Sequence, residues 1–157
     1  MITRRELLAG VVTQLPRSAH DDDFAVRIFR KINDLRMARG AAALAWSDKV
    51  AECAREQSRR KAKLRFPGHN DPEHGDIAAR LNAAGIRWSR CGENLFSESG
   101  WDDPVNFAVT FWWYSTSGHQ QNLLTPEFTE SAIGVVKAED NTFFITQIFL
   151  TPSASAR

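Results

Sequence analysis

The segment that decides the fold lies near the end of the chain and reads Thr142-Phe143-Phe144-Ile145-Thr146-Gln147-Ile148-Phe149-Leu150. Successive side chains of a β-strand point to opposite faces of its sheet. One alternate set here is Phe143, Ile145, Gln147 and Phe149, and the other is Phe144, Thr146, Ile148 and Leu150. Because both sets are mostly apolar, the segment is predicted to be a central strand covered by helices on both sides.

The rest of the chain supplies a second strand and several helices. A polar turn at Glu139-Asp140-Asn141 separates the central strand from an earlier strand over Ala132 to Lys137. Apolar periodicity and capping signals predict the helices. They are expected from Asp21 to Gly40, Ser47 to Lys63, Asp76 to Ala84 and Asp103 to Ser117, with an extended piece from Cys91 to Phe96. Helices that precede a late hairpin, without β-α-β alternation, indicate an α+β fold with a small antiparallel sheet between helical layers.

Three of these helices begin with recognisable capping residues. Asp21-Asp22-Asp23 is expected to cap the first helix, because carboxylates accept bonds from free N–H groups and suit the helix dipole. Ser47 is expected to cap the second helix in the same way. Asp103-Pro104 predicts the start of the last one, with an acid at the N-cap position and proline at the first helical position.

Length and composition bound the class of protein. A chain of 157 residues fits one domain, which we expect over residues 21–152, with tails at 1–20 and 153–157. The net charge of +1 gives no general case for nucleic acid binding. No apolar run reaches the roughly 18 residues that a membrane span needs. Arg4-Arg5 before a short apolar run resembles a weak twin-arginine export leader, and the alternative is a terminal tail.

The two cysteines, Cys53 and Cys91, leave the redox state open. In an exported protein they can pair across the fold, whereas in a cytosolic protein they would be two buried thiols. The chain contains no C-x-x-C motif, so a thiolate zinc site is not expected.

Three polar motifs interrupt the apolar pattern. They are Gly68-His69, Gly92-Glu93-Asn94-Leu95 and the segment from Ser117 through His119 to Leu124. Each motif lies beside a predicted helix, so the three segments can converge on one pocket. Two imidazoles and a carboxylate are suited to metal binding, to acid–base chemistry, or to a polar network that holds loops together.

The ordered set of motifs resembles the CAP superfamily, which includes cysteine-rich secretory proteins, antigen 5 and pathogenesis-related proteins, and in particular its bacterial SCP-like extracellular branch. Gly92-Glu93-Asn94-Leu95 is similar to the GEN-L motif of that superfamily. The segment from Trp113-Tyr114 through Ser117-Gly118-His119 to Leu124 is similar to the W…S-P-G-H-R-x-N-(I/L)-L segment of the bacterial branch. Ile145 to Phe149 is similar to the closing Y-T-Q-V-F strand, and the resemblance extends over residues 24–151.

The resemblance implies a three-layer α-β-α sandwich, export from the cytoplasm, and a central cavity that two His and two Glu line in eukaryotic members. His69 matches the first histidine and Glu93 the first glutamate. Thr116 stands where the second glutamate is expected, and Phe144 where the second histidine is expected. His119 belongs to the bacterial version of the motif, so half of the tetrad is missing.

Four functions are compatible with this cavity. His69, Glu93 and His119 can supply three ligands to a divalent metal such as zinc. A metal-dependent or His/Glu-assisted hydrolase of peptides, esters or cell-wall polymers would need Glu93 to orient His119 beside a serine or threonine. The same residues, with Asn94, can simply brace the loops.

We favour the fourth function, a non-enzymatic binding module. Its cavity would be formed by His69, Glu93 and His119 with three neighbouring residues: Asn94, Thr116 and Tyr114. Tryptophans at 88, 101 or 112 are further candidates for its wall. The expected partner is a small amphiphilic or lipid ligand, or a cell-surface component, and the expected location is secreted, periplasmic or envelope-associated.

Overall fold

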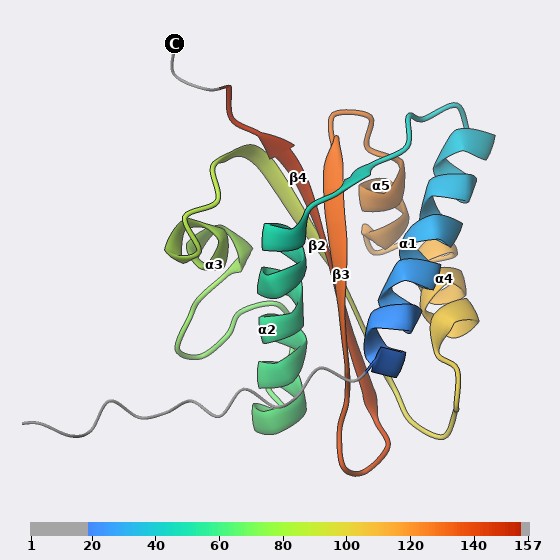
Figure 1. Ribbon diagram of the computed structural model, residues 1–157, viewed down its shortest axis with the longest axis vertical. Coiled ribbons are helices and arrows are strands. Elements are labelled where there is room, and N and C mark those ends of the chain that lie inside the picture. The colour runs from blue at the N-terminus through green and yellow to red at the C-terminus, as the bar shows by residue number, and fades with distance from the viewer. Residues whose placement is uncertain (1–18, 155–157) are drawn as a thin grey trace, which may run out of the picture.

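The computed structural model describes residues 19–154 and is a three-layer α-β-α sandwich (Figure 1). The helices are α1 (Ala19–Ala38), α2 (Asp48–Leu64), α3 (Ile77–Ala83), α4 (Val105–Trp113) and α5 (His119–Leu124). The strands are β1 (Ala45–Trp46), β2 (Trp88–Glu98), β3 (Glu130–Lys137) and β4 (Phe143–Pro152). The predicted fold class is confirmed.

The four strands form one sheet in the order β1-β3-β4-β2. β4 pairs antiparallel with both β3 and β2, so the central position predicted for it is confirmed. β1 is a two-residue strand parallel to β3, and it is the exception to the expected antiparallel sheet. β2 extends over eleven residues, beyond the short extended piece expected at Cys91 to Phe96.

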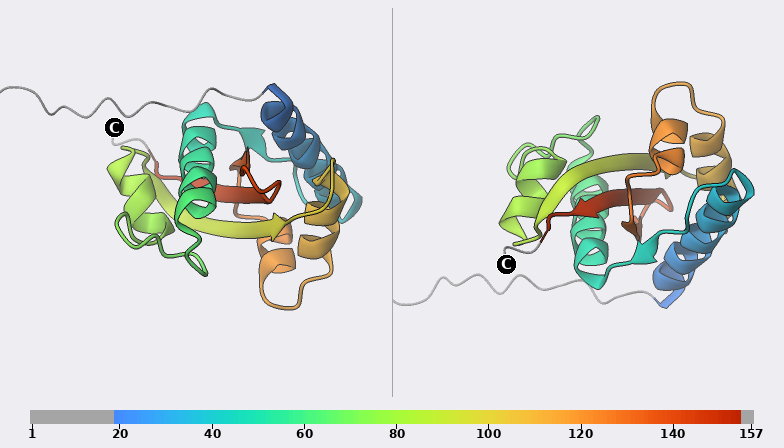
Figure 2. Two further views of the ribbon diagram at one scale, coloured as in Figure 1. Left: turned by 90° about the horizontal axis from the view of Figure 1, so that it is seen from below. Right: turned by 90° about the horizontal axis from the view of Figure 1, so that it is seen from above.

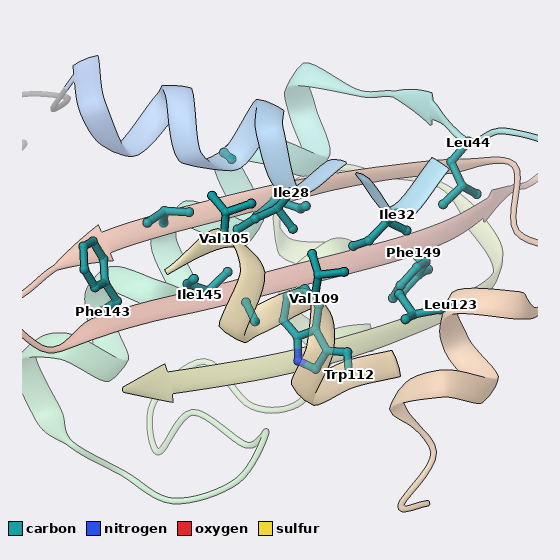
Figure 3. Close-up of a cluster of buried hydrophobic side chains, with 14 of the residues drawn as sticks. Ile28, Ile32, Leu44, Val105, Val109, Trp112, Leu123, Phe143, Ile145 and Phe149 are labelled. Atoms are coloured by element: carbon teal, nitrogen blue, oxygen red, sulfur yellow. The ribbon is translucent and has the colours of Figure 1, made fainter. Parts of the chain in front are cut away.

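The helices cover the two faces of the sheet as separate layers, with α1, α4 and α5 on one side and α2 and α3 on the other (Figure 2). The first layer packs on the set of β4 residues that contains Phe143, Ile145 and Phe149, with Trp112 fully buried between them (Figure 3). The second layer packs on Ile148 of the opposite set. Each helical layer thus uses one of the two apolar faces that the sequence predicted.

The helix starts follow the capping signals in two cases out of three. Ser47 accepts from the backbone N–H of Val50 at 3.5 Å, as expected for the N-cap of α2. The carboxylate of Asp103 accepts from the N–H of Val105 at 3.0 Å, although Pro104 itself takes the N-cap position of α4. The prediction for Asp21-Asp22-Asp23 is borne out in part: Asp21 and Asp22 lie in the first turn of α1, where their charges suit the helix dipole. They do not take the N-cap position, because α1 already begins at Ala19.

Several expectations concern the ends of the chain and the cysteines. The possible leader with Arg4-Arg5, and the tails proposed at both ends, fall largely outside the described residues. In the described part of the chain no helix has both the length and the apolar character to cross a membrane. Cys53 is a buried free thiol and Cys91 a half-buried free thiol, and burial raises the pKa of both.

The close contact of α2 with β3 depends on Gly134. A Cβ atom added at this position would lie 2.2 Å from the backbone nitrogen of Arg55 and 2.4 Å from the carbonyl carbon of Ala54. Backbone atoms of a helix cannot move aside as a flexible side chain can, so any larger residue must push α2 away from the sheet.

We therefore expect Gly134→Ala to lower the free energy of unfolding by about 3 kcal/mol, the upper part of the range for overpacking. Urea denaturation measures this change. Gly100→Ala is the matched control, because Gly100 has open space around it but a φ of +91°, and it should cost only about 1 kcal/mol through backbone strain. Equal costs for the two variants would contradict the close packing of α2.

Candidate functional site

Glu93 is the centre of a buried polar cluster on the α2–α3 side of the sheet. It lies on β2 opposite Ile148 of β4, and only 1% of its side chain is exposed. Its Oε1 lies 2.9 Å from Nδ1 of His69, and its Oε2 accepts from Nη2 of Arg80 at 2.7 Å. Both carboxylate oxygens are therefore engaged, one by a loop and the other by α3.

Arg80 reaches this position from α3, and 6% of its side chain is exposed. A buried carboxylate without a partner would be strongly destabilising, because burial removes the hydration of its charge. The guanidinium of Arg80 supplies the compensating positive charge inside the protein. Sequence reasoning missed this residue. The available signal was an arginine among apolar residues in the short segment Ile77 to Leu81.

The backbone of the His69 loop is fixed by α2 and α3. Nε2 of Gln57 donates to the carbonyl oxygen of His69 at 3.1 Å, and Nζ of Lys61 donates to the carbonyl oxygens of Phe66 and Gly68 at 2.9 and 2.7 Å. The imidazole of His69 remains 49% exposed while it contacts Glu93. The ring of His69 is therefore exposed to solvent, while the backbone of its loop is held in place by hydrogen bonds.

The buried carboxylate of Asp71 stabilises the same loop. Its buried carboxylate bonds the guanidinium of Arg60 and accepts from the N–H groups of Glu73 and His74 at 2.8 and 2.9 Å. Burial alone would raise the pKa of Asp71, but these bonds outweigh it and hold the pKa well below the ordinary value. The ionised carboxylate is thus part of what orders the loop that carries His69.

His119 is the first residue of α5 and has different partners. Its Nδ1 lies 2.8 Å from Oγ of Ser115, which in turn lies 2.9 Å from Oγ of Ser117. Burial lowers the pKa of His119, and its electrostatic interaction with the nearby His69 side chain lowers this pKa further. The ring of Phe111 lies 5.5 Å from the His119 ring. The imidazole of His119 therefore lies between a serine hydroxyl, that of Ser115, and an aromatic ring, that of Phe111.

Asn94 and Asn122 tie α5 to β2. Asn94 is fully buried, and its Nδ2 donates to the carbonyl oxygen of His119 at 3.1 Å. Asn122 donates to Oδ1 of Asn94 at 2.9 Å and to the carbonyl oxygen of Glu93 at 3.3 Å. A Cβ on Gly92 would lie 3.2 Å from Oδ1 of Asn122, so the glycine leaves room for this approach.

The structure brings some of the expected site residues together and separates others. His69 and Glu93 are in contact, and His119 lies near His69 but bonds Ser115. Tyr114 is 76% exposed at the end of α4, and Thr116 is also exposed, so neither joins the buried cluster. Among the tryptophans proposed for the wall, Trp112 is buried in the core, Trp88 bonds Asn82, and Trp101 stacks on Phe107.

The expected metal site and triad are not assembled in the described residues. Within residues 19–154, no three or more His, Cys, Asp or Glu side chains are grouped as metal ligands. Arg80 already occupies one oxygen of Glu93, so a divalent cation does not fit the arrangement. The elements of a triad are divided as well, because Glu93 contacts His69 whereas His119 contacts Ser115. Glu93 does not orient His119, as the hydrolase hypothesis required.

Comparison with known proteins identifies the family. A family model described as CAP, the cysteine-rich secretory protein family, matches residues 29–149. That range is most of the chain, so the chain belongs to the CAP family, as its motifs predicted. The uncharacterized protein YkwD of Bacillus subtilis (strain 168) is 24% identical to it over 112 residues, which are 71% of this chain and 42% of YkwD.

Solved structures share the fold. An extracellular protein containing an SCP domain from Bacillus anthracis str. Ames superposes with a TM-score of 0.71 at 24% identity, over 87% of this chain and 45% of that protein. An outer surface protein from Borrelia burgdorferi gives a TM-score of 0.75 at 18% identity, over 88% of this chain and 97% of that protein. The chain thus spans less than half the length of YkwD and of the Bacillus anthracis protein.

The buried ion pair gives a direct prediction for stability. Arg80→Met leaves the charge of Glu93 buried and uncompensated, so we expect a loss of about 3–5 kcal/mol in the free energy of unfolding. The double variant Arg80→Met with Glu93→Met should lose less than the single variant, because no isolated charge remains. Urea denaturation of the double variant and of the two single variants, Arg80→Met and Glu93→Met, measures the coupling, and simple additivity would show that the pair does not interact.

Asp71 predicts a dependence of stability on pH. Because its pKa is lowered in the folded state, its contribution is present above the ordinary carboxyl pKa and is lost as the pH falls through the folded value. Asp71→Asn should cost about 2 kcal/mol at pH 7. The gap from wild type should narrow below about pH 4. The control Asp34→Asn, at an exposed position of α1, should keep the wild-type profile.

Proposed function

We propose that this CAP domain is a non-enzymatic binding module that works outside the cytoplasm. Its binding site is the central polar cluster of His69, Glu93 and His119 together with the aromatic side chain of Phe111. The ligand is a small amphiphilic molecule, such as a lipid, or an amphiphilic component of a cell surface. The observation that carries this proposal is that a fixed polar cluster and an exposed aromatic ring adjoin each other at His119.

The apolar part of the proposed site has a structural basis in α4. The inner face of this helix is buried, but its outer face carries Phe107, Phe111 and Tyr114, which are 40%, 51% and 76% exposed. Their spacing of four and three residues places them along one side of the helix. Phe96 supports Phe111 at a ring distance of 5.6 Å. Exposed aromatic side chains beside polar groups favour ligands that are partly apolar.

The polar part of the site favours binding over catalysis. General acid–base chemistry needs a carboxylate or imidazole that is free to exchange a proton with the substrate. Both oxygens of Glu93 are held, one by Arg80 and the other by His69, so this carboxylate is not free to exchange a proton with a substrate. The lowered pKa of His119 keeps its ring neutral near pH 7, which suits a hydrogen bond to an uncharged ligand group.

The location outside the cytoplasm rests on the family. Two structural neighbours are described as an extracellular protein and an outer surface protein. Cell fractionation with an antibody against residues of the described domain tests this part of the proposal. Recovery of the protein only in the cytoplasm would contradict it.

The ligand prediction is tested with a bacterial total lipid extract. At about ten times the dissociation constant, ligand binding to the folded state should raise the melting temperature by roughly 4 °C. Native mass spectrometry of the same sample should show a lipid adduct. Phe111→Ser removes the ring beside His119 and should reduce the shift by at least half, an estimate that follows from the lost apolar burial.

Phe107→Ser is the matched control for this experiment. It removes the same type of side chain from the same helix, but its ring stacks on Trp101 and not on the His119 region. It should therefore reduce the ligand-induced shift less than Phe111→Ser does. If the extract produces neither a shift nor an adduct with the wild-type protein, the binding proposal is wrong.

A further inference from the structure

A serine and a histidine meet at the turn between α4 and α5, which lies at the periphery of the molecule (Figure 2). Oγ of Ser115 lies 2.8 Å from Nδ1 of His119 and 2.9 Å from Oγ of Ser117. The proposed lipid site uses His119, whereas the hydroxyl of Ser115 has no part in it. A hydroxyl beside an imidazole nitrogen is the arrangement that activates a serine as a nucleophile.

Two further hydrogen bonds hold this turn in place. Nδ2 of Asn94 donates to the carbonyl oxygen of His119 at 3.1 Å, so β2 fixes the start of α5. Nε2 of Gln120 donates to the carbonyl oxygen of Trp113 at 2.7 Å and links α5 back to the end of α4. The hydroxyl of Ser115 and the imidazole therefore meet on a fixed backbone, which is the condition for a preorganised reacting pair.

The hydrogen bonds around Ser115 can direct its proton to His119. A hydroxyl has one proton and two lone pairs, and the backbone N–H of Ser117 donates to Oγ of Ser115 at 3.2 Å. Burial lowers the pKa of His119, so its ring is neutral near pH 7 and one ring nitrogen accepts. With the ring hydrogen on Nε2, Nδ1 accepts from Ser115, and the hydroxyl of Ser117 donates to the second lone pair of Ser115. All of these groups are then satisfied.

The nucleophile and the base differ in their access to solvent. Ser115 and His119 are both half-buried. The hydrogen bond between the hydroxyls of Ser115 and Ser117 is exposed, whereas the one between Ser115 and His119 is partly buried. A small electrophile can therefore approach Oγ of Ser115 from the solvent, while the imidazole lies on the protein side of the hydroxyl.

We propose that Ser115 is a site of covalent acylation by activated esters, with His119 as its general base. Oγ of Ser115 attacks the acyl carbon, and Nδ1 of His119 takes the hydroxyl proton. A bond forms between Oγ and the acyl carbon, and the bond from that carbon to the leaving group breaks with its electron pair. The proton then passes from His119 to the leaving group. The products are O-acylserine, a free phenol or thiol, and a neutral imidazole.

The substrate class follows from what the dyad of Ser115 and His119 lacks. Base catalysis contributes roughly 10²–10⁴-fold, and serine hydrolases add an oxyanion hole and a carboxylate that orients the imidazole. Both oxygens of Glu93 are engaged by Arg80 and His69. The ester must therefore have a weakly basic leaving group, such as a phenolate or a thiolate.

The reaction stops at the acylated protein. O-acylserine is an ester of an ordinary alcohol, whose alkoxide is a much poorer leaving group than a phenolate or a thiolate. The same dyad therefore cannot hydrolyse the product at a rate close to that of its formation. A single acylation without turnover agrees with a binding module that is not an enzyme.

The test uses p-nitrophenyl acetate as the probe. The wild-type protein should release about one equivalent of p-nitrophenolate above the uncatalysed background, as expected for an acyl-protein that accumulates. Peptide mass spectrometry should locate the acetyl group on Ser115. Ser115→Ala should lose this acetyl group, and His119→Gln should acquire it at least about a hundredfold more slowly. Thr116→Val is the matched control, because it removes an exposed hydroxyl next to Ser115, and it should keep the wild-type rate.

A second measurement needs no variant. Long-range ¹H–¹⁵N NMR of the wild-type protein shows which ring nitrogen of His119 carries the hydrogen, and we expect Nε2. The proposal is overturned if Ser115 of the wild-type protein is not acetylated, if His119→Gln reacts at the wild-type rate, or if the hydrogen is on Nδ1. The lipid experiment measures reversible binding and this one a covalent bond, so either proposal can fail without the other.

Discussion

The buried pair of Arg80 and Glu93 is the interaction on which the polar half of the molecule depends. It joins α3 to the long strand β2 in a place where neither charge is accessible to water. Once Glu93 is compensated in this way, its other oxygen is available to fix His69 and with it the loop after α2. A charge pair of this kind contributes little net stability, but it specifies which segments meet. The geometry of the polar cluster therefore follows from an internal cation supplied by the chain itself.

The sheet separates two environments, and each of them is covered by its own layer of helices. The α1, α4 and α5 layer buries most of the large apolar side chains, including Trp112 and Phe149. The α2 and α3 layer allows α2 to approach β3 at Gly134, and it holds the buried side chains of Gln57, Arg80 and Glu93. Because α5 and the His69 loop both reach the β2 edge, residues from the two layers can act together there. The surface of the protein at this edge is therefore aromatic on one side and polar on the other.

Sequence patterns predicted the parts of the fold that have long periodic signals. β4 was found because its alternate residues are apolar on both faces. The start of α2 was found because Ser47 caps it, and that of α4 because Asp103-Pro104 precedes it and Asp103 accepts from the N–H of Val105. β1 has two residues and α5 has six, so neither has enough length to show a period. In the site, motif resemblance predicted the neighbourhood of His69 and Glu93. The role of Arg80 depends on a contact between α3 and β2 that no local pattern encodes.

β2 is a long strand at the edge of the sheet, and this has a consequence for how the protein behaves at high concentration. An uncovered edge offers free carbonyl and N–H groups to a strand of another molecule, which is a common route to aggregation. Here the carbonyl oxygen of Glu93 accepts from Asn122 and that of Leu95 accepts from the indole of Trp112 at 2.9 Å. These side chains take the places that a foreign strand would use in the middle of the edge. The residues that hold α4 and α5 against the sheet therefore also occupy two acceptors of the β2 edge.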